Sequence, residues 1–137
     1  MKKITLLLSL IFLINCSSTR DEEVKEQNNK YYLYKIIEIT DGTEKVHNYE
    51  SGQCESNTNI FFDTNNKVTW QGFNMTSGNN CTSSTAYYTY DSNKKKIQIF
   101  SYMYYSVKDL DNQIVLQTHM EENDDPNYTT IYYFKKK

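Results

Sequence analysis

The chain has 137 residues, of which 38% are hydrophobic, 23% charged and 15% aromatic, and its formal net charge is −2. This length fits one compact domain, and four Gly and one Pro are too few for a collagen-like or low-complexity repeat. Because the chain has no basic surplus with which to neutralise phosphates, nucleic acid is not an expected partner.

The N-terminus has the pattern of an export signal. A basic start, Lys2 and Lys3, precedes an apolar run over residues 4–14, and Cys16 follows two residues later. At about 1.5 Å per residue this run covers little more than half of a roughly 30 Å hydrocarbon core. We therefore expect a cleaved signal and no permanent transmembrane helix.

The sequence Leu13-Ile14-Asn15-Cys16 resembles the lipobox of bacterial lipoproteins, although Asn15 stands where Gly, Ala or Ser is usual. The resemblance implies that residues 1–15 are removed and that Cys16 carries a lipid, and two or three acyl chains would hold the protein on a membrane. The alternative is an ordinary signal peptide with a chance Cys.

Residues 17–30 form a polar segment in which Val24 is the single apolar side chain, so we expect residues 16–30 to serve as a lipidated Cys and tether. The cluster Arg20-Asp21-Glu22-Glu23 resembles the acidic signals that send some Gram-negative lipoproteins to the outer face of the outer membrane. A solvated linker explains the cluster equally well. The expected location is the cell envelope, anchored by lipid at the outer membrane and exposed at the cell surface if the signal reading holds.

Residues 31–137 are expected to form one all-β domain. Short runs rich in Tyr, Ile, Val, Thr and Phe alternate with clusters of Asn, Asp, Ser, Gly and Lys, which is typical of hairpin-linked strands. The predicted strands are residues 31–40, 45–50, 59–63, 67–73, 85–90, 96–102, 103–110, 113–120 and 128–134. So many strands with short connections favour an antiparallel up-and-down meander of about eight strands closed into a barrel, because closure removes exposed edges.

The order of features along the chain resembles the lipocalin-like domains of bacterial lipoproteins. These features are the lipobox and tether, Cys54 before a strand that ends in Ile60-Phe61-Phe62, a second Cys at 81, a Tyr-turn-Ile-x-Ile hairpin over residues 88–99, and a closing strand that ends in Tyr-Phe-Lys-Lys. The Gly-x-Trp usual in the first strand is replaced by Tyr31-Tyr32-Leu33-Tyr34. The resemblance implies a monomeric barrel that binds a small apolar or amphipathic ligand.

Cysteine use fits an exported protein. With Cys16 acylated, Cys54 and Cys81 remain as a pair in an oxidising compartment, so we expect them to form a disulfide. A metal site is the weaker alternative, because no second Cys pair or His stands at ligand spacing.

No catalytic or cofactor motif is present, and we expect neither enzymatic activity nor a cofactor. His47 and His119 are far apart in sequence, and structural or solvent-facing roles suit both. The acidic residues 121–125 offer oxygen ligands for a loose Ca²⁺ site, but they lack EF-hand spacing and suit a solvated hairpin tip better.

Thirteen Tyr are the most unusual feature of the composition. Aromatic side chains in a barrel mouth can bind sugars or apolar ligands, and Trp70 and Tyr88 are the residues that we name for such a site. Tyr also favours strands, and an A/T-rich coding sequence enriches it without selection for function. Two functions stay open. One is a ligand-binding lipoprotein, and the other is an envelope interaction protein whose barrel is filled by its own side chains.

Overall fold

Nine β-strands form the body of the computed structural model, which describes residues 29–121 and 128–137. A short 3₁₀ helix, η1 (Glu55–Asn57), is the one helical element among these residues. No helix in the described part of the chain is both long and apolar enough to cross a membrane. The strands are β1 (Lys30–Thr40), β2 (Thr43–Asn48), β3 (Asn59–Phe62), β4 (Lys67–Thr76), β5 (Asn80–Asp91), β6 (Lys96–Phe100), β7 (Met103–Leu110), β8 (Gln113–Met120) and β9 (Tyr128–Lys135).

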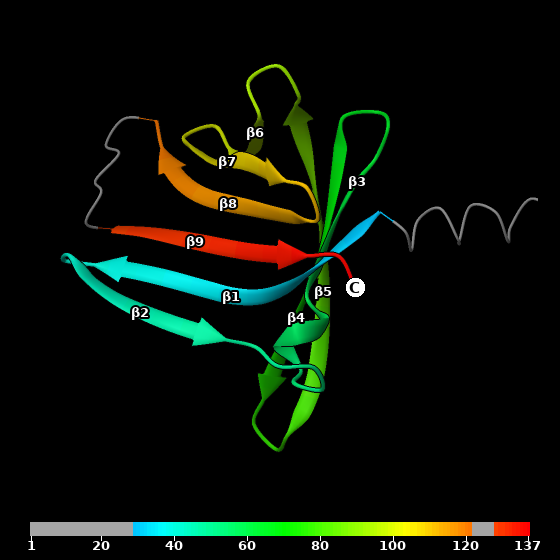
Figure 1. Ribbon diagram of the computed structural model, residues 1–137, viewed down its shortest axis with the longest axis vertical. Coiled ribbons are helices and arrows are strands. Elements are labelled where there is room, and N and C mark those ends of the chain that lie inside the picture. The colour runs from blue at the N-terminus through cyan, green and yellow to red at the C-terminus, as the bar shows by residue number, and fades with distance from the viewer. Residues whose placement is uncertain (1–28, 122–127) are drawn as a thin grey trace, which may run out of the picture.

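Eight of these strands close into an antiparallel barrel. Strands β3 to β9 follow one another as neighbours, and β1 completes the ring by pairing with β9 on one side and β3 on the other. Only the first residues of β1 pair with β3, as in the pair Tyr32 and Asn59. Further along β1, the edge that faces β3 pairs instead with β2, which is an extra strand outside the ring. Figure 1 shows β1, β2, β8 and β9 running across the direction of β4 and β5.

Alternating side chains and tight turns explain why these segments form hairpins. Val68 on β4 and Ile97 on β6 are fully buried, whereas their neighbours along each strand are more exposed. Asn66 and Asn79 adopt positive φ at the β3–β4 and β4–β5 turns, a conformation that Asn tolerates better than most residues. The predicted closed antiparallel barrel is therefore confirmed, with one additional strand.

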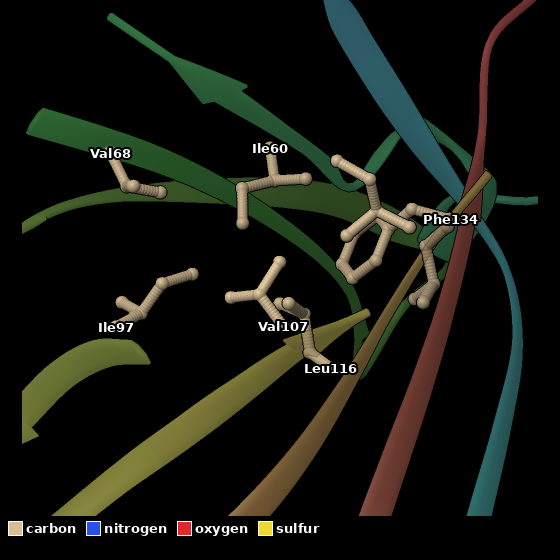
Figure 2. Close-up of a cluster of buried hydrophobic side chains, with 8 residues drawn as sticks. Ile60, Val68, Ile97, Val107, Leu116 and Phe134 are labelled. Carbon is tan, nitrogen blue, oxygen red and sulfur yellow. The ribbon is translucent and has the colours of Figure 1, made fainter. Parts of the chain in front are cut away.

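The core occupies the middle of the barrel. Its buried side chains come from seven of the eight ring strands and point toward one another, as Figure 2 shows for six of them. The fully buried members are Ile60, Val68, Ile97, Leu116 and Phe134. These inward-facing apolar side chains are removed from water together, and this burial is the main contribution to the stability of a barrel of this size.

The β4–β5 hairpin is longer than the sequence predicts. We expected strands over residues 67–73 and 85–90, but the pairing continues to Thr76 and Asn80. The added part of β5 is polar and its side chains are exposed, so it carries no hydrophobic alternation by which to recognise it. Gly78 and Asn79, both at positive φ, make the tight turn that lets the two strands extend beyond the barrel (Figure 1).

Candidate functional site

One end of the barrel holds a hollow of about 320 Å³, here called the mouth hollow. It lies at the end where β1 begins and where the β3–β4, β5–β6 and β7–β8 turns meet. Ligand pockets usually measure roughly 300–1,000 Å³, so the mouth hollow is large enough for one small molecule. Its lining residues are Asn29, Tyr31, Phe62, Tyr90, Val107, Asp109 and Ile114.

The mouth hollow has an apolar floor and a polar rim. Val107 and Ile114 line it and also belong to the buried core, so its floor is the upper surface of that core. Phe62 and Tyr90 form an edge-to-face pair with ring centroids 5.0 Å apart. Asp109 is the one charged side chain among the lining residues. Such a site can hold an apolar group on its floor and a hydrogen-bonding group at its rim.

The hydroxyl of Tyr90 is held in its protonated form. Burial is the main cause that raises its pKa, and the negative charges of Asp109 and Asp91 raise it further. A neutral phenol beside a carboxylate offers one donor and several acceptors within the same rim. This combination favours a polar group that carries N–H or O–H donors.

Trp70 and Tyr88, the residues named from sequence, lie deeper in the barrel and are not among the residues lining the mouth hollow. Trp70 stacks on Tyr105 at 5.7 Å and meets the rings of Tyr132 and Phe134 edge-on at 5.2 and 5.3 Å. Tyr88 also packs against the core. The rings of Trp70, Tyr88 and their partners fill the interior beyond the mouth hollow, whereas Phe62 packs against the core from the hollow itself.

Hydroxyl groups accompany this aromatic packing. Tyr105 donates a hydrogen bond to Tyr132, and burial is the main cause that raises the pKa of both. Tyr88 lies close enough to contribute to both shifts. The interior therefore pairs its own polar groups, which stabilises a filled barrel and reduces the number of donors left for a ligand.

Cys54 and Cys81 form the expected disulfide, with their Cα atoms 5.5 Å apart. The bond joins the segment before η1 to the beginning of β5. The same segment also holds β4, because the backbone N–H of Phe73 donates to the Thr58 hydroxyl at 2.9 Å. The disulfide is thus a structural link and lies away from the mouth hollow. Cys16, residues 17–28 of the tether and most of the acidic stretch 121–125 lie outside the described residues.

The two histidines have separate, local partners. His47 Nε2 lies 3.2 Å from Glu38 Oε2 at an exposed position across β1 and β2. His119 stacks on Tyr104 with centroids 5.1 Å apart and lies 2.9 Å from the Ser106 hydroxyl. Within residues 29–121 and 128–137, no three His, Cys, Asp or Glu side chains gather where a metal ion could be held.

None of the residues that line the mouth hollow, such as Tyr31, Tyr90, Asp109 and Ile114, was named as a ligand-binding residue from the sequence. One signal could have found them. In an up-and-down barrel, the inward-facing residues nearest the turns of one end meet around its mouth, and Tyr90 and Ile114 stand next to such turns. The signal becomes usable only when the inward face of every strand is known.

No protein-family model matches this chain, and no curated protein sequence matches it either. Its closed antiparallel barrel fits a lipocalin-like fold and is compatible with ligand binding. The fold does not identify the ligand, because function belongs to the site and not to the architecture.

Proposed function

We propose that this protein is a non-enzymatic, lipid-anchored lipoprotein of the bacterial cell envelope that binds a small amphipathic molecule in the mouth hollow. The observation that carries the proposal is the combination of an apolar floor with a rim that bears Asp109 and the Tyr90 hydroxyl. An alkyl group would pack against Phe62, Val107 and Ile114 and would thereby be removed from water. A head group with N–H donors would lie at the rim.

The lipid anchor on Cys16 would bring this site close to a membrane. Asn29, at the end of the tether, itself lines the mouth hollow, so the hollow lies where the tether joins the barrel. A random chain of the length of residues 17–29 has a root-mean-square reach of about 20 Å. An anchored barrel would therefore present the mouth hollow to molecules that partition into the lipid surface. The acidic residues after Cys16 favour the outer membrane as the location of the anchor.

Dodecylammonium and dodecanoate provide a direct test, because they share an alkyl chain and differ in head-group charge. Calorimetric titration of the disulfide-bonded chain should give tighter binding of dodecylammonium. Because Asp109 is exposed, its replacement in Asp109→Asn should weaken dodecylammonium binding by only about two- to fivefold. Asp111→Asn is the matched control, since it removes one carboxylate from the same turn at a residue outside the lining.

A filling substitution tests the apolar floor. Ile114→Trp places a large ring in the mouth hollow and should abolish binding of both probes, whereas Val46→Trp, at an exposed position on β2, should leave binding unchanged. Near-ultraviolet circular dichroism checks that each variant is folded. Equal binding by Ile114→Trp and the unchanged chain would overturn the proposal.

A second candidate is an envelope protein that acts through its surface. The filled interior favours it, because Phe62, Trp70, Tyr88 and Phe134 all pack in or against the core. Exposed aromatic side chains are available for contact with a protein or glycan, including Tyr87, which is 76% exposed. Failure of both probes to bind the folded chain would move the proposal to this function.

A further inference from the structure

Four lysine side chains lie over four tyrosine rings where β1 begins and β9 ends. The Lys35 and Lys137 ammonium groups lie 3.9 and 4.0 Å from their ring centroids, and those of Lys135 and Lys136 lie 5.1 Å from theirs. These distances are within the range of cation–π contact. The pairs, here called the lysine–tyrosine patch, are Lys35 with Tyr133, Lys135 with Tyr34, Lys136 with Tyr31 and Lys137 with Tyr32.

No carboxylate among residues 29–121 and 128–137 forms an ion pair with a lysine of the patch. In the described part of the chain, lysines form ion pairs in Lys94 with Asp91 and in Lys96 with Glu121, and neither pair involves the patch. An aromatic ring holds an ammonium group in place but leaves its charge intact. Three lysines of the patch are exposed, so their charge is available to a partner; they are Lys135, Lys136 and Lys137.

Charge is unevenly distributed along the barrel. Four aspartates lie at the mouth end, but seven lysines there outnumber them; the aspartates are Asp63, Asp91, Asp109 and Asp111, and the lysines are Lys30, Lys67, Lys94, Lys95, Lys135, Lys136 and Lys137. All glutamates among the described residues lie toward the end opposite the mouth hollow, near the β1–β2 turn, η1 and the end of β8; they are Glu38, Glu44, Glu50, Glu55 and Glu121. The patch lies at the other end, where β1 begins (Figure 1). A negatively charged surface would attract one end of the barrel and repel the other, which gives a defined orientation.

We propose that the lysine–tyrosine patch docks the barrel onto an anionic phospholipid surface. Lysines with tyrosine rings suit such a surface, because ammonium groups meet lipid phosphates while aromatic side chains favour the head-group region. A membrane suits the patch better than a soluble polyanion does. The reason is that the segment following Cys16 joins β1 directly beside the patch. The choice of a membrane therefore rests on the proposed anchor at Cys16.

Docking would also orient the mouth hollow. Tyr31 belongs to both features, because its ring lies under Lys136 and lines the hollow. When the patch contacts lipid, the opening of the hollow lies beside the head groups. The surface contact thus places the proposed binding site at the source of amphipathic molecules.

The test uses the chain from residue 16 with Cys16→Ser, which retains every strand and cannot be lipidated. We would measure its co-sedimentation with vesicles of equimolar phosphatidylglycerol and phosphatidylcholine, and with vesicles of phosphatidylcholine alone. Binding should require phosphatidylglycerol and weaken as salt is added. Each lysine near an anionic surface changes partition by about fivefold, so Lys135→Gln, Lys136→Gln and Lys137→Gln together should weaken it roughly a hundredfold.

A matched variant separates the patch from net charge. Lys45→Gln, Lys94→Gln and Lys95→Gln remove the same charge from exposed residues outside the patch, one on β2 and two at the β5–β6 turn. Because none of these lysines lies over a patch tyrosine, the change should weaken vesicle binding less. Equal loss in the two triple variants, or equal sedimentation with both kinds of vesicle, would overturn the proposal. So would binding of a single-stranded oligonucleotide through the patch without binding to phosphatidylglycerol vesicles. Ile114→Trp should still bind the vesicles, which distinguishes a failure of docking from a failure of the mouth hollow.

Discussion

Removing the Cys54–Cys81 disulfide should lower the stability of the barrel without changing its shape. The double variant Cys54→Ala and Cys81→Ala leaves the neighbouring contacts between the η1 segment and β4 in place. These are the two hydrogen bonds between Thr58 and Phe73, 2.9 and 3.3 Å long, and the bond from the Met75 backbone N–H to Glu55 at 3.2 Å. We therefore expect the hairpin to keep its position in the folded variant.

The size of the effect follows from the loop that the bond closes. A sequence separation of 27 residues gives a loss of about 3.5 kcal/mol when the constraint on the unfolded chain is removed. This is a large fraction of the roughly 5–15 kcal/mol by which domains are stable. Cys54 is buried but small, so the change to Ala should add little to the loss.

Urea unfolding followed by far-ultraviolet circular dichroism measures this difference. The oxidised unchanged chain is compared with the double variant, and thiol titration confirms that the disulfide is intact in the reference. The slope of the transition should also rise in the variant, because its unfolded state is more expanded. A loss below about 1 kcal/mol would refute the loop-entropy reasoning.

Three further changes test the core, the tyrosines and the ion pair. Phe134→Ala empties a fully buried site and should cost about 3–5 kcal/mol in urea unfolding; an effect below 2 kcal/mol would contradict a packed core. Burial raises the pKa of Tyr105 in the folded protein above its value of about 10 in the unfolded chain. The stability that the neutral Tyr105 hydroxyl contributes is therefore present below about pH 10 and is lost as the pH rises further. The melting temperature of Tyr105→Phe should therefore fall less steeply above pH 10 than that of the unchanged chain or of the exposed control Tyr87→Phe. Glu121→Gln breaks a 2.6 Å ion pair with Lys96 at a partly exposed position, and should cost about 0.2–1 kcal/mol in low salt and less in high salt.

The fold could largely be read from the sequence because strands and turns are local features. Met103–Leu110 and Gln113–Met120 form strands with the predicted bounds, and the Asp and Asn clusters that lie between strands within the described residues form turns. The sequence does not predict that β2 lies outside the ring. Its position depends on β3 pairing with the first residues of β1 and β2 pairing with the later ones. The polar end of the β4–β5 hairpin was missed because it is held by its turn, the disulfide and the neighbouring hydrogen bonds, and no apolar face marks it.

The candidate site was harder to predict than the fold because it is assembled across hairpins. Phe62, Tyr90 and Ile114 come from three strands that are far apart in sequence, and only the closed ring brings them together. Trp70 and Tyr88 were named because aromatic residues often line sites, but they pack near the core, where large rings exclude most solvent. Residue type alone could not distinguish these two positions in the barrel.

The most direct test is to measure the mass of the protein purified from the cell envelope in which it is made. The exported chain would be purified from the envelope, and its mass under native conditions compared with its mass after denaturation. If the mouth hollow binds a small amphipathic molecule, the native mass should exceed the denatured mass by one such molecule, and Ile114→Trp should show no excess. A bare polypeptide mass that persists after incubation with envelope lipid extract would contradict the proposed binding.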